Sequence, residues 1–330
     1  MAIRASKINF AVLIAVAGAM ACIVSVRAET PEQSLNLYWD NDGTFIKPYL
    51  STDRHYTNGM KLVYTNQPDW KLLKEFSRWN GFGGNDAEVT TAMGYFFGQN
   101  IYTPDHISEP ALRSIHDQVF AGWLYGGVFA QRATQNEMEH FELNLGVIGP
   151  LSQAEEMQRF IHRMMGIDAP EGWHSQLGNE FAADFTWMRK QKTDGLPFKN
   201  TSNFDSHIEY GFTAGSVHRN ANLGLVLRWG YNLPNDFGPG RMEMPSSACG
   251  RTADDKSSAY LFTRVGGRAV LYDRFLSGLE EEPAVGLIQV GLVYRYKSLQ
   301  VGYSQTFMTR EYKEQPHADS IGTLTVTYYF

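Results

Sequence analysis

The sequence predicts an all-β protein, a transmembrane antiparallel β-barrel of about 12 strands with a short helix in an extracellular loop. Apolar and polar residues alternate with a period of two through most of the chain. Many of these stretches reach the roughly 9–11 residues that a tilted strand needs to cross a bilayer, and the chain ends on an aromatic residue, in "TLTVTYYF". A soluble β-sandwich tolerates the same alternation, but it has shorter strands and does not need a terminal aromatic residue, so the barrel is favoured.

The expected strands follow one another to the C-terminus. The last one alternates threonine with large apolar side chains up to Thr327. Period-two stretches lie at 34–41, 55–66, 87–98, 117–131, 135–147, 175–191, 204–217, 220–231, 257–275, 284–297, 298–311 and 319–330. Aromatic residues recur near the strand ends, as interfacial girdles require, and Trp123 and Tyr125 are expected to belong to such a girdle.

The first 28 residues read as a secretory signal peptide. Arg4 and Lys7 precede the apolar run "INFAVLIAVAGAMACIV", and small residues end the segment at Ala28. The alternative is a lipoprotein with its lipid on Cys22, but "AMAC" departs from the residues expected before such a cysteine. Residues 29–330 would then form the barrel, and no later apolar run reaches the roughly 18 residues of a spanning helix.

Charge and cysteine content exclude further classes of partner and cross-link. The formal net charge of the chain is −6, which argues against nucleic acid as a partner. Removal of the signal peptide leaves Cys249 as the only cysteine, so an internal disulfide is excluded. A closed barrel has no exposed strand edge to pair, so we expect a monomer.

An even number of strands places the N- and C-termini of the barrel domain on the same side of the membrane, the periplasmic side. The exterior connections are then 42–54, 99–116, 148–174, 218–219, 276–283 and 312–318. Asn41 and Asp42, Thr57 and the whole of loop 148–174 therefore lie at one rim.

The loop 148–174 carries its own predicted helix. Ser152 and Glu155 form a capping box before a helical run that Gly166 ends. Residues three or four apart share a helix face, which groups Gln158, His162 and Met165. Met157, Ile161 and Met164 form the adjoining apolar stripe, expected to pack on the barrel or to touch lipid.

Several ordered motifs carry a family resemblance. They are "NDG" after the first strand, "TDRHYTNG" opening the second, "GQNIYTP" after the third, "HDQVFAGWLYGG" in the fourth, and "GVIGPLSQAEEMQRFIHRMMGIDAPEGWHSQLGNE". Together they resemble the outer-membrane lipid A 3'-O-deacylase family from about residue 35 to 191. Beyond residue 191 the resemblance continues as strand pattern only.

The resemblance implies a twelve-stranded barrel in the bacterial outer membrane, with a calcium-dependent esterase site between the wall and an extracellular helix, acting on lipid A or lipopolysaccharide of the outer leaflet. Asn41 and Asp42 match the family's Asn-Asp pair and would bind Ca²⁺. Thr57 and His162 match its catalytic positions. Asp168 stands where the family has an acidic residue past the helix, as a shorter carboxylate than the expected Glu.

Two further residues are candidates for substrate binding. Gln158 shares the helix face of His162, and Arg113 is the single cation of the loop "TPDHISEPALRS". Because phosphorylated sugars call for cations, Arg54, Arg159 and Arg163 would have to supplement it, or the substrate would be a less phosphorylated lipid.

The residue types suit ester hydrolysis in their own right. The reaction needs an activated water and a site for the negative charge that develops on the carbonyl oxygen. A neutral imidazole is the natural base, and Ca²⁺ prefers the oxygen ligands that Asn, Asp and Thr supply. The serine-hydrolase motif "GxSxG" does not occur in the chain.

Simpler interpretations remain open. A histidine on a loop helix is most often solvated, "NDG" is ordinarily a turn, and "DNDG" fails as an EF-hand because Ser51 occupies the twelfth position. His55 competes with His162 as the base, because it shares a strand face with Thr57. The alternative function is a non-catalytic outer-membrane barrel, either a channel or a structural, adhesin-like protein.

Overall fold

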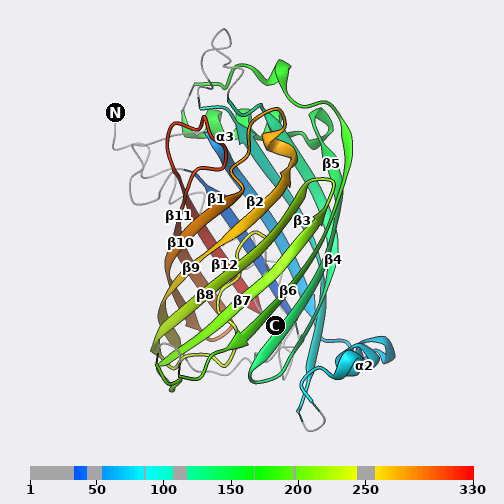
Figure 1. The fold of residues 1–330 in the computed structure, drawn as a ribbon, viewed down its shortest axis with the longest axis vertical. Coiled ribbons are helices and arrows are strands. Elements are labelled where there is room, and N and C mark those ends of the chain that lie inside the picture. Colours follow the sequence, from blue (N-terminus) through cyan, green and yellow to red (C-terminus); the bar gives the residue numbers. More distant parts are fainter. Residues whose placement is uncertain are drawn as a thin grey trace.

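The computed structural model describes residues 33–42, 54–84, 87–105, 107, 117–166, 168–195, 198–243 and 257–330. Within these ranges the chain forms a closed antiparallel barrel in which each strand pairs with its neighbours in sequence (Figure 1). The first and last strands close the barrel, with Leu37 opposite Val326. The predicted fold class is confirmed. The predicted signal peptide, Arg113 and Cys249 lie outside the described residues.

The barrel strands are β1 (Gln33–Asn41), β2 (His55–Asn66), β3 (Thr90–Thr103), β4 (Ala121–Ala133), β5 (Glu137–Ile148), β6 (Glu180–Lys192), β7 (Phe204–Gly215), β8 (His218–Tyr231), β9 (Ser258–Asp273), β10 (Ala284–Tyr296), β11 (Leu299–Met308) and β12 (Asp319–Tyr329). The helices are α2 (Lys71–Arg78) and α3 (Ala154–Met165), with short 3-10 turns η1 (Trp79–Gly81), η3 (Pro150–Ser152), η4 (Trp173–Ser175) and η5 (Arg274–Leu276). None of the described helices has the length and apolar character needed to cross a membrane.

Three strand boundaries differ from the sequence prediction. β3 was expected at 87–98 but runs on to Thr103, which pairs with His55 of β2. The motif "GQNIYT" is therefore strand rather than loop, because its polar Asn100 faces the polar lumen, where Tyr125 donates to it at 3.3 Å. β4 and β6 begin at Ala121 and Glu180, several residues later than predicted.

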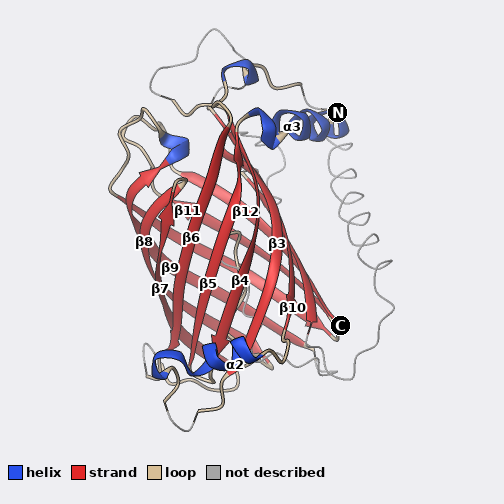
Figure 2. Ribbon diagram, turned by 90° about the vertical axis from the view of Figure 1, so that its right-hand side faces the viewer, coloured by secondary structure: helices blue, strands red, loops and turns tan. Residues whose placement is uncertain are grey.

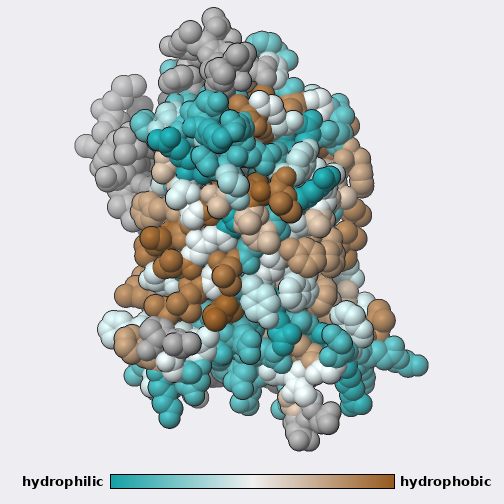
Figure 3. Space-filling view, viewed as in Figure 1, coloured by the Kyte–Doolittle hydropathy of each residue, from teal (hydrophilic) through white to brown (hydrophobic). Residues whose placement is uncertain are grey.

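The outer face of the wall is apolar. On the face seen in Figure 3, brown and tan side chains gather across the middle of the barrel, between hydrophilic ends. The exposed large side chains that alternate outward along the strands include Leu62, Phe97, Val128, Leu143, Leu145, Leu261, Val265, Ile288, Val290 and Leu292. Such a belt matches the hydrocarbon core of a bilayer.

The lumen, by contrast, is filled by paired charges. Lys61 lies 2.9 Å from Glu142, and the Arg264 guanidinium lies 2.8 Å from Glu209. All four side chains are almost fully buried. Burial of a charge is tolerated because its partner replaces the lost water.

Trp123 and Tyr125 also point into this lumen. They belong to one buried cluster, with ring centroids 4.3 Å apart, so their assignment to the lipid-facing girdle was wrong. The alternation of β4 was read correctly, but composition alone does not tell which face of a strand is the polar one, and these rings accompany polar lumen residues.

The two ends of the barrel carry different elements. We call the end with α3 the outer rim, and the end where β1 starts and β12 stops the inner rim; α2 lies at the inner rim (Figure 2). The described part of the 232–256 connection turns back into the lumen. There the carbonyls of Met242 and Phe237 accept hydrogen bonds from Lys61 and Lys190, at 3.3 and 3.1 Å.

Candidate active site

A β-bulge at the outer rim brings the Asn-Asp pair to Thr57. The register between β2 and β3 shifts between Tyr56 and Asn58, so Thr57 has no partner across the ladder. Its carbonyl oxygen instead accepts from the Asn41 side-chain amide at 3.3 Å and from the Asp42 backbone N–H at 3.2 Å. A β-bulge leaves one residue unpaired and changes the direction in which its side chain points. The structure therefore brings Asn41, Asp42 and Thr57 together, as the sequence predicted.

The Thr57 hydroxyl is fixed by a neighbour on β3. Thr57 Oγ1 and Thr103 Oγ1 are 2.6 Å apart, and both residues are buried. Ile101, two residues earlier on the same face of β3, packs in a cluster with Ala154 and Trp173. The threonine pair therefore lies on the outer surface of the wall, next to the contact with α3.

The helix α3 turns a polar stripe toward the wall. Gln158 and His162 are four residues apart and almost fully buried, whereas Met157, Phe160 and Met164 are exposed. The methionines of the predicted apolar stripe therefore do not pack on the barrel. They extend the apolar surface outward, on the side where lipid would lie.

The start of α3 differs from the predicted capping box. Its N-cap is Gln153, in a left-handed conformation, and no side chain caps the helix. Ser152 belongs to η3, where its carbonyl accepts from Gln99 of β3 at 2.6 Å. The turn approaches the wall so closely that a Cβ on Gly122 would lie 2.1 Å from the Ser152 hydroxyl. At the other end, Gly166 caps the helix with φ 68°, as predicted.

His162 is oriented by a backbone carbonyl. Its Nδ1 lies 2.6 Å from the Asp168 carbonyl oxygen. Since a carbonyl only accepts, Nδ1 carries the hydrogen and Nε2 carries the lone pair of the neutral ring. This is the tautomer that a general base needs. The Asp168 carboxylate is exposed, so the observed contribution of Asp168 to this arrangement comes from its main chain.

The side chain of Gln158 is held by Trp173, which follows α3 in the chain. Its Oε1 accepts from the indole N–H of Trp173 at 2.8 Å, and Trp173 is itself buried. The amide nitrogen of Gln158 is buried and has no hydrogen-bond partner among the described residues. A fixed, buried N–H donor of this kind is unusual and suits a ligand oxygen.

The donors near Thr57 fit a hard cation. Asn41 and Asp42 offer amide and carboxylate oxygens on adjacent residues, and Asp42 is oriented by the Arg54 backbone N–H at 2.8 Å. Within the described ranges no group of three or more His, Cys, Asp or Glu side chains converges. A calcium site here would therefore also draw on backbone carbonyls or water, which Ca²⁺ accepts readily.

His55, the competing base, is engaged at both ring nitrogens. Nδ1 lies 2.8 Å from Asp319, and Nε2 lies 3.0 Å from the Tyr312 hydroxyl. Burial, followed by the nearby Asp117, raises the pKa of the Tyr312 phenol, so the hydroxyl stays protonated and donates to Asp117 at 3.1 Å. His55 thus joins the 309–318 connection to the wall, which favours a structural role.

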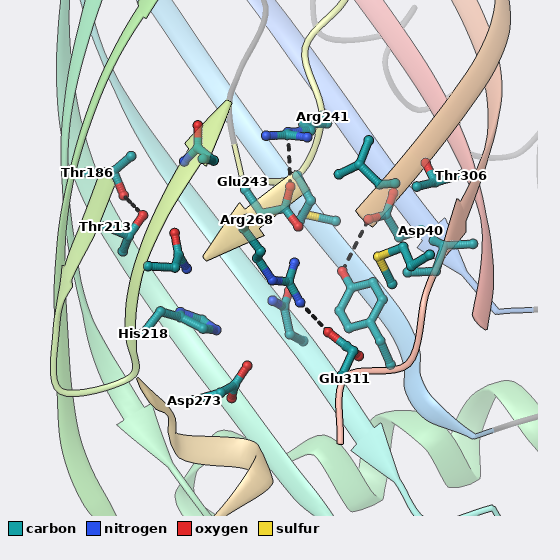
Figure 4. Close-up of a pocket in the computed structure, with 18 of the residues that line it drawn as sticks. Asp40, Thr186, Thr213, His218, Arg241, Glu243, Arg268, Asp273, Thr306 and Glu311 are labelled. Atoms are coloured by element: carbon teal, nitrogen blue, oxygen red, sulfur yellow. Dashed lines mark hydrogen bonds and ion pairs between the residues drawn. The ribbon is translucent and has the colours of Figure 1, made fainter. Parts of the chain in front are cut away.

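A cavity of about 180 Å³ lies inside the lumen, separate from the helix–wall contact. Figure 4 shows its polar lining, in which Arg268 pairs with Glu311 and Arg241 pairs with Glu243. Asp40 and Tyr56 of the same lining are hydrogen-bonded to each other at 3.3 Å. Because each of its arginines and its lysine lies beside a carboxylate, the lining resembles the paired lumen rather than the rim.

The sequence matches a family model described as Outer membrane protein LpxR over residues 10–330. The chain belongs to the LpxR family. This confirms the resemblance to the outer-membrane lipid A 3'-O-deacylases and places the barrel in the outer membrane. The rim that carries α3 is accordingly called extracellular from here on, and the opposite rim periplasmic.

The fold is shared with a solved outer-membrane protein, LpxR, and a porin matches over a similar length without a comparable overlap. LpxR from Salmonella typhimurium is 20% identical with a TM-score of 0.72, and the match covers 90% of this chain and 100% of that one. The KdgM porin in complex with oligogalacturonate is 8% identical with a TM-score of 0.37, covering 90% and 99% of the two chains. No curated protein sequence matches.

Sequence reasoning missed two residues of the site. Thr103 lies in the quoted motif "GQNIYTP", but it was placed in a loop because β3 was ended too early. Trp173 follows the predicted helix and carries no motif of its own. The one available signal was its place within the long family motif after Gly166.

Proposed function

We propose that this protein is a calcium-dependent esterase of the outer membrane that removes an ester-linked acyl chain, the 3'-O chain, from lipid A. Family membership supports lipid A deacylation in general terms. The observation that carries the finer proposal is the buried His162, held in the base tautomer by the Asp168 carbonyl at 2.6 Å.

His162 takes a proton from water in the proposed reaction. Its Nε2 receives the proton while the Nδ1–H bond to the Asp168 carbonyl keeps the ring in place. The hydroxide that forms attacks the ester carbonyl. The bond between the carbonyl carbon and the sugar oxygen then breaks, and His162 gives the proton to that oxygen, so that the sugar leaves as an alcohol and the acyl chain as a fatty acid. General-base catalysis of this kind contributes about 10²–10⁴-fold.

Gln158 and Thr57 would bind oxygen atoms that take part in the reaction. The Gln158 amide N–H, buried and fixed by Trp173, can donate to the oxyanion as charge develops. The Thr57 hydroxyl, held by Thr103, can position the water or the ester. Both groups are ordered by neighbours before substrate arrives, which lowers the cost of reorganisation.

Asn41 and Asp42 would hold Ca²⁺ from the barrel wall, and Asp168 would supply a carboxylate from the helix side. When bound, the ion supplies positive charge that polarises the ester carbonyl. The Arg54 backbone N–H donates to the Asp42 carboxylate at 2.8 Å and orients it.

The surroundings favour a lipid substrate. The exposed Met157, Phe160 and Met164 would meet acyl chains of the outer leaflet. Arg159 is paired with Glu155 at 2.8 Å, and Arg54 lies 3.6 Å from Asp105. Arg163, which is exposed on α3 one residue after His162, would then bind a lipid A phosphate.

The test is deacylation by the purified full-length protein in detergent micelles containing lipid A. We expect fatty acid release that stops with a chelator and returns when Ca²⁺, but not Mg²⁺, is added back. Release that continues unchanged in the chelator would contradict the calcium requirement. No release from a correctly folded, calcium-loaded protein would contradict the deacylase proposal.

A further inference from the structure

The strongest unexplained feature outside the active site is α2, at the periplasmic rim. It is reached directly from β2 and stands out sideways from the wall in Figure 1. Three large apolar side chains along it and its flanks are about half exposed or more: Trp70 at 49%, Leu72 at 71% and Trp79 at 58%. Large exposed apolar groups on one short segment indicate a contact with an apolar phase or a partner.

The segment is attached to the outside of the barrel. Arg132 of β4 and Glu139 of β5 are opposite each other in the ladder, on the face that carries the exposed Val128 and Leu143. They are nevertheless almost fully buried, because the end of α2 and the turn after it lie over Arg132. The Arg132 guanidinium donates to the carbonyls of Phe76 and Trp79, at 2.8 and 2.7 Å.

Aromatic contacts continue this attachment. Phe76 meets Phe141 of β5 edge to face, with ring centroids 5.4 Å apart, and Trp79 lies 6.3 Å from the same ring. Phe141 shares its strand face with Leu143 and with Leu145, which are exposed to lipid. The apolar surface of the wall therefore runs without a break onto α2.

The sequence of α2 divides the helix into two faces. At 100° per residue, Leu72, Phe76 and Trp79 fall on one side, and Lys71, Lys74 and Arg78 fall on the other. The cations are partly neutralised: Lys74 lies 2.5 Å from Asp69 and Lys71 lies 3.8 Å from Glu75. Attraction to anionic lipid is thus a minor contribution, and the apolar face is the main one.

We propose that α2 is an interfacial helix that lies on the periplasmic leaflet of the outer membrane. Leu72, Phe76 and Trp79 enter the boundary between headgroups and acyl chains, while Lys71, Lys74 and Arg78 face the phosphates and water. This is the arrangement of amphipathic helices that bind in the plane of a bilayer. The partner is a phospholipid surface, because the apolar face is continuous with the lipid-facing wall.

The test uses spin labels on the two faces of the helix. Cysteines replace Leu72 on the apolar face or Lys74 on the opposite face, in a full-length protein whose Cys22 and Cys249 are replaced by serine. Both positions are exposed, so neither label disturbs a packed contact. The protein is reconstituted in liposomes of phosphatidylethanolamine and phosphatidylglycerol, and collisions with oxygen and with a water-soluble nickel chelate are measured.

We expect the ratio of oxygen to nickel collisions to be severalfold higher for the Leu72→Cys label than for the Lys74→Cys label. A third label at Lys297→Cys, in the β10–β11 turn of the same rim, reports the value for periplasmic water. Equal, water-like ratios at Leu72 and Lys74 would overturn the proposal and would assign the apolar face to a periplasmic protein partner instead. The deacylase assay is independent of this result.

Discussion

Two buried histidines, one in the lumen and one at the extracellular rim, are held by different kinds of hydrogen-bond partner. His140 in the lumen has a side chain at each ring nitrogen, with Gln131 at 3.1 Å and Glu142 at 3.2 Å. His162 is fixed at Nδ1 by a main-chain carbonyl, at 2.6 Å. The first ring is one member of a balanced network. The second is oriented by the backbone, in the tautomer that the proposed general base requires.

The same contrast holds for two threonine pairs. Thr186 and Thr213 bond each other at 2.9 Å across β6 and β7 in the lumen lining (Figure 4). Thr57 and Thr103 bond each other at 2.6 Å on the outside of the wall, beside the β-bulge. The chemistry of the pair is identical, so its position on the wall should decide whether activity depends on it.

The largest expected effect is that of His162→Ala. Loss of the base should lower kcat by about 10²–10⁴-fold, with little change in the free energy of unfolding. Deacylation kinetics and urea unfolding in liposomes measure the two quantities. His140→Gln is the matched control, for which we expect nearly unchanged kcat. Equal losses of activity in both variants would show that the reaction does not depend specifically on the histidine at the rim.

Lys61→Met should give the opposite result. It leaves Glu142 buried without its main partner, at an expected cost of about 3–5 kcal/mol in unfolding free energy. The active site is not touched, so kcat of the folded fraction should stay the same.

The double variant Lys61→Met with Glu142→Leu removes both charges of this lumen pair. It should recover most of the lost stability, because no uncompensated charge remains. A double variant as unstable as the single one would mean that the pair itself stabilises the barrel.

Thr57→Val should lower kcat by about tenfold, since it removes one ordered hydroxyl without changing the volume of the side chain. Thr213→Val in the lumen pair is the control and should retain full activity. The comparison is made on deacylation rates at saturating Ca²⁺. Equal rates for the two variants would show that the rim hydroxyl has no part in the reaction.

The smallest effect is expected for Asp168→Asn. The backbone carbonyl that orients His162 is retained, so kcat at saturating Ca²⁺ should be close to that of the parent protein. The loss of a carboxylate should raise the Ca²⁺ concentration for half-maximal activity severalfold. An unchanged calcium dependence would remove Asp168 from the ligand set and leave Asn41 and Asp42.

Much of the barrel could be predicted because alternation has a clear physical cause. A wall between lipid and a polar lumen imposes a period of two on every strand, and each predicted strand corresponds to one of the barrel strands described. The even number of strands also predicts that Asn41, Asp42 and Thr57 share one rim, where the structure brings them into contact. Period alone does not assign the faces, however, which is why Trp123 and Tyr125 were placed on the wrong one.

The details of the site depended on backbone geometry that a sequence pattern does not contain. The bulge at Thr57 shifts the register by one residue, and the left-handed Gln153 replaces the expected capping box. Trp173 reaches Gln158 across a turn with no regular period. The helix α2 escaped prediction because eight residues form too short a segment to establish a helical repeat.

The most direct test of the central claim is mass spectrometry of lipid A from a host outer membrane that carries the wild-type protein, His162→Ala or His140→Gln. We predict that the wild-type protein and His140→Gln remove one ester-linked acyl chain, that chelation of Ca²⁺ prevents this, and that His162→Ala leaves lipid A intact. Intact lipid A with folded, calcium-supplied wild-type protein, or full deacylation by His162→Ala, would contradict the account.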